Sequence, residues 1–284
     1  MLTVRKSIKS FVITSLGVIG SGAIGTLLLT PDAKAATLSF SESTFEFSNF
    51  SVSPLNTSVE AVTDTLTVSR NGIVQATADA QSIFVTPPLS PASAFNFVSS
   101  LTTGEGLDYF GAADSFAGIV GDFSIGSGEV FSFDFTGSIV LNTEIEAPIF
   151  EVASSLAAIN FNLSTLMDDG SVGTSLDYLN ILAFLNTPGL DSYSLEKTDS
   201  ISLNSLSISQ SSGSLAESFV ALFSGTFSRF FPQATKVQLS EAKAGLASIS
   251  ASPYAIPEPL TILGSLLAVG IGGLLRKEYY KIQP

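Results

Sequence analysis

The stretch Val130-Phe-Ser-Phe-Asp-Phe-Thr-Gly-Ser-Ile-Val-Leu141 decides the fold class of this chain. Phe131, Phe133 and Phe135 alternate with small polar residues up to Gly137, and a second apolar run follows at 139–141. Successive side chains of a β-strand point to opposite faces of the sheet. The period of two therefore predicts a strand that buries its phenylalanines on one face.

The same alternation recurs on both sides of this strand. The predicted strands contain Phe45 and Phe47, residues 66–68, 157–164, 176–185, 201–209 and 219–227. In 201–209 the alternation slips phase at Asn204-Ser205, which predicts a β-bulge. About ten to twelve short strands with regular turn signals are typical of a two-sheet β-sandwich. We expect an all-β fold, a single antiparallel β-sandwich that is jelly-roll-like.

Several segments between these strands carry turn or breaker signals. Asn71-Gly72 predicts a hairpin turn, because both residues tolerate the positive φ that such a loop requires. The prolines of 87–91 predict a crossover loop, with a domain linker as the alternative. The glycine-rich segment 104–128 predicts loops and tight hairpins. After a last strand at 236–239, Ser240–Ala247 is consistent with a short helix.

Composition excludes several functional classes. The chain has no Cys, His or Trp, so thiolate nucleophiles, histidine bases and Cys/His zinc sites are ruled out. Between residues 36 and 255, five cationic against 22 acidic side chains leave a net charge of −17. Such a surface repels nucleic acid and anionic lipid, and suits divalent cations or neutral glycans. We expect no enzymatic activity, although a glycan-cleaving enzyme with a Glu/Asp pair lining a cleft is a lesser alternative.

Calcium is the one cofactor that the carboxylates of this chain suggest. Asp168 and Asp169 lie in a Gly-containing loop, and Asp177 follows downstream. Calcium prefers carboxylate and carbonyl oxygens, so these three aspartates are a possible site. The loop lacks the spacing of an EF-hand, and a solvated β-turn closed by aspartate side chains explains the same residues.

The N-terminus resembles a secretory signal peptide in its layout. Basic residues precede an uncharged apolar run from Ser10 to Pro31, which ends in Ala33-Lys34-Ala35. This order predicts residues 1–35 as a signal peptide, cleaved between Ala35 and Ala36. The alternative is an uncleaved N-terminal membrane anchor.

The C-terminus, residues 256–284, has three consecutive parts. Pro257, Glu258 and Pro259 precede an uncharged apolar run, 260–275, and the basic residues Arg276, Lys277 and Lys281 follow. Although 16 residues are fewer than the about 20 that span a bilayer, flanking lysine and arginine side chains help such a run to insert. The basic cluster then stays in the cytoplasm and the acidic body outside. A buried core helix is the alternative.

This tail resembles the PEP-CTERM sorting signal of bacterial exported proteins. The resemblance covers about 29 residues, and the basic tail is longer than the family pattern. It implies recognition by an exosortase, a membrane protease or transpeptidase that cuts near the Pro-Glu-Pro motif. It also implies an association with exopolysaccharide, biofilm or cell-surface matrix.

These observations predict three segments: a signal peptide at 1–35, an acidic β-sandwich ectodomain at 36–255 and a sorting signal at 256–284. We expect an exported, non-enzymatic surface or matrix protein that contributes structure or adhesion in the exopolysaccharide layer. A calcium- or glycan-binding module is the alternative. Membrane contact is expected only through the C-terminal helix of the precursor.

Overall fold

A computed structural model describes residues 37–86 and 91–252 of the chain. The described residues form an antiparallel all-β fold without helices, which confirms the predicted class. They include no helix of the length and hydropathy needed to cross a membrane. The predicted signal peptide and sorting signal lie outside the described residues.

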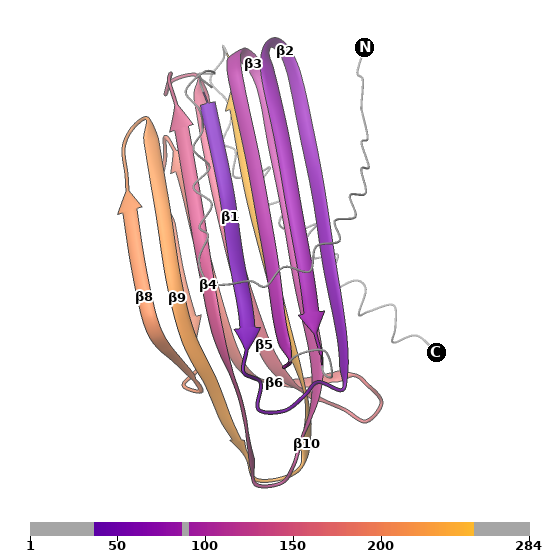
Figure 1. The fold of residues 1–284 in the computed structure, drawn as a ribbon. Helices are drawn as coiled ribbons and strands as arrows, with labels where there is room; N and C mark the ends of the chain where they lie inside the picture. The colour runs from indigo at the N-terminus through magenta and orange to yellow at the C-terminus, as the bar shows by residue number, and fades with distance from the viewer. Residues whose placement is uncertain (1–36, 87–90, 253–284) are drawn as a thin grey trace. The chain divides into compact units, whose positions relative to one another are not determined.

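Ten strands belong to one hydrogen-bonded sheet (Figure 1). Its order is β7-β6-β5-β10-β3-β1-β4-β9-β8, and β2 pairs with β3 beside this path. The strands are β1 (Thr37–Ser48), β2 (Asn56–Val85), β3 (Ser93–Ile125), β4 (Glu129–Ile145), β5 (Glu151–Leu166), β6 (Val172–Thr187), β7 (Ser192–Lys197), β8 (Ile201–Ser211), β9 (Ala216–Phe231) and β10 (Thr235–Ala251).

The sheet folds over on itself until it is nearly closed. β2 and β3 are the longest strands and pair with each other throughout, and the other neighbour of β3 differs between its two parts. Residues 94–104 of β3 pair with β1, whereas residues 109–125 pair with β10. We call β7, β6, β5, β10 and the adjoining part of β3 the first half-sheet, and β8, β9, β4, β1 and the other part of β3 the second. β2 extends both half-sheets.

Glycines allow β2 and β3 to bend between the two half-sheets. Gly106 and Asp108 of β3 have φ angles of 88° and 60°. A Cβ on Gly72 of β2 would approach the Glu105 carbonyl oxygen to 2.6 Å, so only glycine fits there. The hairpin predicted at Asn71-Gly72 is therefore wrong, because both parts of β2 pair with β3 and not with each other. Figure 1 shows both strands turning over together.

The glycine-rich segment 104–128 is also not a set of loops, as its composition had predicted. Nearly all of it belongs to β3, and a turn begins only at Gly126. Gly104 and Gly111 are needed for packing, because a Cβ there would collide with Tyr109 and Val74. The crossover predicted at 87–91 is wrong, because β2 and β3 on either side of it are antiparallel neighbours in the same sheet. The same pairing argues against the alternative, a domain linker.

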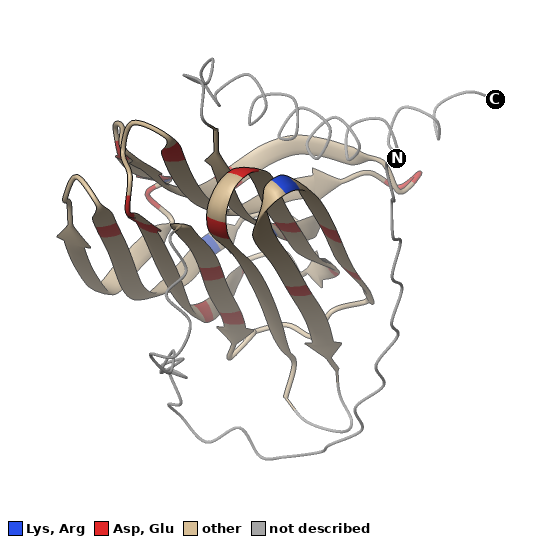
Figure 2. Cartoon of the chain, turned by 90° about the horizontal axis from the view of Figure 1, so that it is seen from above, with Lys and Arg blue, Asp and Glu red and all other residues tan. Residues whose placement is uncertain are grey.

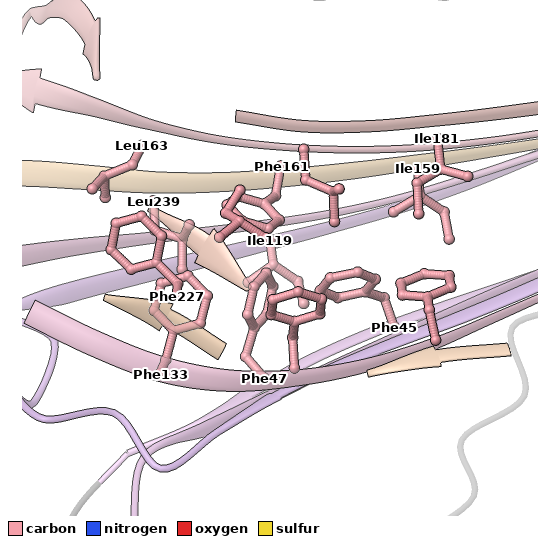
Figure 3. Close-up of a cluster of buried hydrophobic side chains, with 14 of the residues drawn as sticks. Phe45, Phe47, Ile119, Phe133, Ile159, Phe161, Leu163, Ile181, Phe227 and Leu239 are labelled. Carbon is pink, nitrogen blue, oxygen red and sulfur yellow. The ribbon is translucent and has the colours of Figure 1, made fainter. Parts of the chain in front are cut away.

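Phenylalanine fills one end of the space between the half-sheets. Phe45 and Phe47 of β1 meet Phe161 of β5 across the interior, with ring centroids 6.3 and 5.9 Å apart. Phe133 of β4 and Phe227 of β9 stack at 4.8 Å beside them. Figure 3 shows these side chains pointing toward one another from the two layers. The predicted inward face of 131–135 is confirmed.

Serine fills the neighbouring part of the interior, which we call the serine zone: Ser39, Ser41, Ser100, Ser115 and Ser155, with Gly245. The Oγ atoms of Ser39 and Ser41 donate to the carbonyls of Ser154 and Leu156 in β5, at 2.5 and 2.6 Å. A serine hydroxyl reaches only two bonds beyond Cα. The backbones therefore lie much closer here than the about 10 Å typical of stacked sheets.

The last strand departs from the sequence-based expectation. β10 runs to Ala251, so the strand predicted at 236–239 is longer and the short helix predicted at 240–247 is wrong. β10 pairs with β3 on one side and β5 on the other along this segment. Two hydrogen-bonded neighbours override weak helix propensity. By contrast, the bulge predicted at Asn204-Ser205 is confirmed by a register shift between Leu203 and Ser205.

Replacing Gly137 by alanine should destabilise the fold, because the new Cβ would collide with the rings of Phe223 and Phe45. Overpacking of this kind costs about 1–3 kcal/mol of unfolding free energy. Gly118→Ala is the matched control, since its Cβ would meet Phe116 at an ordinary 3.4 Å. Denaturant unfolding of the full chain measures both variants. Equal stability of the two would contradict the packing described here.

Candidate functional site

The N-terminal parts of β1 and β3 place polar side chains inside and apolar side chains outside. Thr37, Ser39, Ser41 and Ser43 of β1 are all fully buried. The β1 pairings with β3 and β4 contain no register shift. Because residues alternate faces in a regular strand, Leu38 and Phe40 must lie on the outer face of the second half-sheet.

β3 repeats this inverted pattern in part beside β1, although Ala94 and Val98 are also buried on its inner face. Asn96, Ser100 and Thr102 are buried, whereas Phe95, Phe97 and Leu101 alternate with them on the outer face. The register sets Phe40 opposite Leu101, Thr44 opposite Phe97 and Glu46 opposite Phe95. We call this surface the aromatic face: Phe40, Phe95, Phe97 and Leu101, with the carboxylates Glu42, Glu46 and Asp79.

The aromatic face combines half-buried rings with acidic and hydroxyl groups. Glu42 lies opposite Ser99, and Asp79 of β2 lies opposite Ser99 from the other side. Burial raises the pKa of Glu42. Thr44 and Ser138 share a hydrogen bond of 2.7 Å on the same face. The paired strands place no Lys or Arg among these outward-facing residues, so the face offers apolar area and hydrogen-bonding oxygens without positive charge.

Sequence reasoning missed the aromatic face. The available signal was the change of phase within β1, where Leu38 and Phe40 fall on even numbers but Phe45 and Phe47 on odd numbers. A strand without a bulge buries only one of these sets. Across the described residues, acidic positions are spread over both half-sheets, while basic positions are few (Figure 2).

The three aspartates predicted as a possible calcium site have separate partners. Asp168 forms an exposed ion pair with Lys236 at 2.9 Å. Asp169 accepts hydrogen bonds from the amide and hydroxyl of Ser171, which close the predicted turn. Asp177 is buried on β6 and pairs with Arg229 at 2.8 Å. Within 37–86 and 91–252, no three carboxylates are grouped so as to hold a metal ion.

A Glu/Asp pair does occur between the two half-sheets, with one carboxyl from each. Glu217 of β9 and Asp191, before β7, lie within hydrogen-bonding reach of each other. Burial, followed by the charge of Asp191, raises the pKa of Glu217. Thr187 donates to Glu217, and Thr187 and Thr143 share a bond of 2.6 Å. The carboxyls are closer than the about 5–9 Å that separates glycosidase pairs.

A charged cluster lies where the serine zone meets the phenylalanine core. Glu241 and Lys243 point inward from β10 and are only 2% and 1% exposed. The side-chain amide of Asn96 donates to Glu241, and Lys243 Nζ donates to the backbone carbonyl of Asn96 at 2.6 Å. Burial is the main cause that raises the pKa of Glu241 to about 7 and lowers the pKa of Lys243 to about 7. Because these side chains are closed off from solvent, we expect the cluster to affect the stability of the fold and not the binding of a ligand.

The residues predicted for export lie outside the described part of the chain. They are the cleavage residues Ala33, Ala35 and Ala36, the motif Pro257, Glu258 and Pro259, and the basic residues Arg276, Lys277 and Lys281. No protein-family model matches this chain, and no curated protein or solved structure matches it.

The buried pair should make the free energy of unfolding pass through a minimum near pH 7. The pKa of Glu241 is raised in the folded chain, so its contribution falls as pH rises from 4.5 to about 7. The pKa of Lys243 is lowered, so its contribution recovers between about 7 and 10.5. Each change is on the order of 3–5 kcal/mol.

The double variant Glu241→Gln, Lys243→Met isolates this effect, because it keeps the side-chain shapes and removes both charges. The difference in unfolding free energy between the variant and the natural chain should be largest near pH 7 and favour the variant. Parallel pH profiles of the two proteins would show that neither group is titrated as described.

Proposed function

We propose that this chain is an exported, non-enzymatic protein of the cell surface or extracellular matrix, and that its β-body contributes adhesion in the exopolysaccharide layer. The order of a signal peptide, an acidic Cys-free body and a PEP-CTERM-like tail supports export. The aromatic face supports adhesion. Together these features fit a body that contacts matrix polymers after sorting by an exosortase.

The proposal rests mainly on one observation, the outward placement of Phe40, Phe95 and Phe97 while serine occupies the interior. Burying apolar rather than polar side chains is the general rule, so half-buried rings on the outer face beside a polar interior need another explanation. Aromatic rings can cover the apolar faces of sugars, and neighbouring carboxylates and hydroxyls can bond sugar hydroxyl groups. The acidic charge disfavours polyanionic glycans.

The route to the surface is also part of the proposal. Residues 1–35 direct secretion, and 260–275 form a membrane helix in the precursor. Exosortase processing near Pro257–Pro259 then detaches the body from that helix. We propose that the antiparallel sheet between them is a jelly-roll-like β-sandwich.

Loss of two rings should weaken binding to neutral polysaccharide. The double variant Phe40→Ala, Phe97→Ala of the full chain should co-sediment less with microcrystalline cellulose or other insoluble neutral glucans. Its Kd for these glucans should be about tenfold higher than that of the unaltered chain. Phe230→Ala is the matched control, because this phenylalanine is 59% exposed but lies on β9 away from the aromatic face. None of these proteins should bind alginate, which is a polyanionic glycan.

Unchanged binding by the double variant would exclude the aromatic face as the adhesion surface. Binding to no neutral glycan in a broad panel, with circular dichroism showing a folded protein, would overturn the adhesive role itself.

Replacing the motif prolines should block processing. In a host with an exosortase, Pro257→Ala with Pro259→Ala should leave the chain in the membrane fraction with its C-terminal tail intact by mass spectrometry. The unaltered chain should be recovered outside the cytosol without the tail. Recovery of the mature unaltered protein only in cytosol would refute export.

A further inference from the structure

The first part of β2, Asn56–Ser69, is an edge strand that lacks the usual protection against pairing. Of the edges outside β2, β7 has only six residues and β8 carries a bulge. Short edge strands, bulges, prolines and lysines are the features that prevent sheets from pairing edge to edge. Asn56–Ser69 contains no proline, lysine or glycine, and its pairing with β3 is regular throughout.

This edge is exposed on both faces of the sheet. All of Asn56–Ser69 is exposed, including Val62, Leu66 and Val68 at 51%, 54% and 47%. These three side chains share the outer face, because they lie opposite Phe116, Ala112 and Phe110 of β3. The strand is held in place by β3 along its length and by a bond from Ser82 Oγ to the Glu60 carbonyl. Figure 1 shows β2 at the margin of the fold.

The charges on this edge are complementary to those of a second copy of the same strand. Glu60 and Asp64 are the charged residues of Asn56–Ser69, and Arg70 follows directly. Two copies of the strand that meet antiparallel about a two-fold axis at Thr65 place Glu60 opposite Arg70 of the second copy. The same register places Val62 opposite Val68 and Asp64 opposite Leu66. Cross-strand pairs of opposite charge and of β-branched residues both stabilise a sheet.

Neighbouring registers are less favourable. A two-fold axis at Val62 sets Glu60 against Asp64, and an axis at Asp64 sets that residue against itself; like charges directly opposite are destabilising. Arg70 is exposed and forms no ion pair with another described residue, so it is available to a second molecule.

We propose that Asn56–Ser69 is a homodimerisation edge, at which two copies of this chain join their first half-sheets antiparallel about a two-fold axis at Thr65. The symmetry makes the contact self-complementary, so it closes as a dimer and does not extend into a fibre. The proposal concerns β2 alone and does not depend on the function proposed for the aromatic face.

A single cysteine tests the register directly, because the chain has no cysteine of its own. Thr65→Cys in the full chain should form a disulfide-linked dimer under mild oxidation, because residue 65 faces itself across the axis. Thr63→Cys and Thr67→Cys are matched controls on the same face. Each alone should cross-link poorly, whereas a mixture of the two should form a heterodimer, because 63 lies opposite 67.

Charge exchange tests the same contact without cross-linking. Glu60→Arg should raise the dissociation constant of the dimer at least about tenfold, measured by sedimentation equilibrium. The arginine at position 60 of each copy would then face Arg70 of the other copy, and like charges directly opposite are destabilising. Adding Arg70→Glu should restore dimerisation. A monomeric natural chain, or equal cross-linking at 63, 65 and 67, would overturn the proposal.

Discussion

Hydrogen bonds from serine hydroxyls to backbone carbonyls of the opposite half-sheet set the spacing on which the rest of the structure depends. Ser39 and Ser41 of β1 bond the β5 backbone, and Ser100 bonds the Gly245 carbonyl of β10 at 3.0 Å. A Cβ on Gly245 would lie 3.3 Å from Ser41 Oγ of the opposite half-sheet, so glycine matches this narrow gap. Beyond it the half-sheets separate, and phenylalanine fills the wider space.

This arrangement determines which side chains remain for the surface. Once serine and asparagine take the interior of β1 and β3, the alternation of the strands forces Phe40, Phe95 and Phe97 outward. Most of the buried serine and threonine hydroxyls are hydrogen-bonded, whereas those of Ser43 and Thr102 have no partner among the described residues. The outer face carries aromatic rings beside carboxylates. The proposed adhesive surface is thus a direct consequence of the narrow serine zone.

Sequence patterns predicted the fold where one phase of alternation runs through a whole strand. β4 is an example, and its phenylalanines at 131–135 are buried as expected. In β8 the phase slips once, and the bulge predicted from that slip is present. In β1 the apolar residues change phase, from Leu38 and Phe40 to Phe45 and Phe47. Which of the two sets is buried depends on the packing of the opposite half-sheet against β1. Similarly, the glycines of β3 have the composition of a loop in the sequence. In the structure, the side chains of Tyr109 and Val74 occupy the space that a Cβ would take at these positions. The aromatic face could not be predicted because it follows from those long-range contacts.

The most direct test of the narrow serine zone compares Ser41→Leu with Ser41→Ala in denaturant unfolding of the full chain. The alanine variant loses one hydrogen bond, which costs about 1 kcal/mol. The leucine variant also has to force the half-sheets apart, so it should be less stable than the alanine variant by at least about 2 kcal/mol. A leucine variant as stable as the alanine variant, or more stable, would show that the interior has room at Ser41 and would contradict the account.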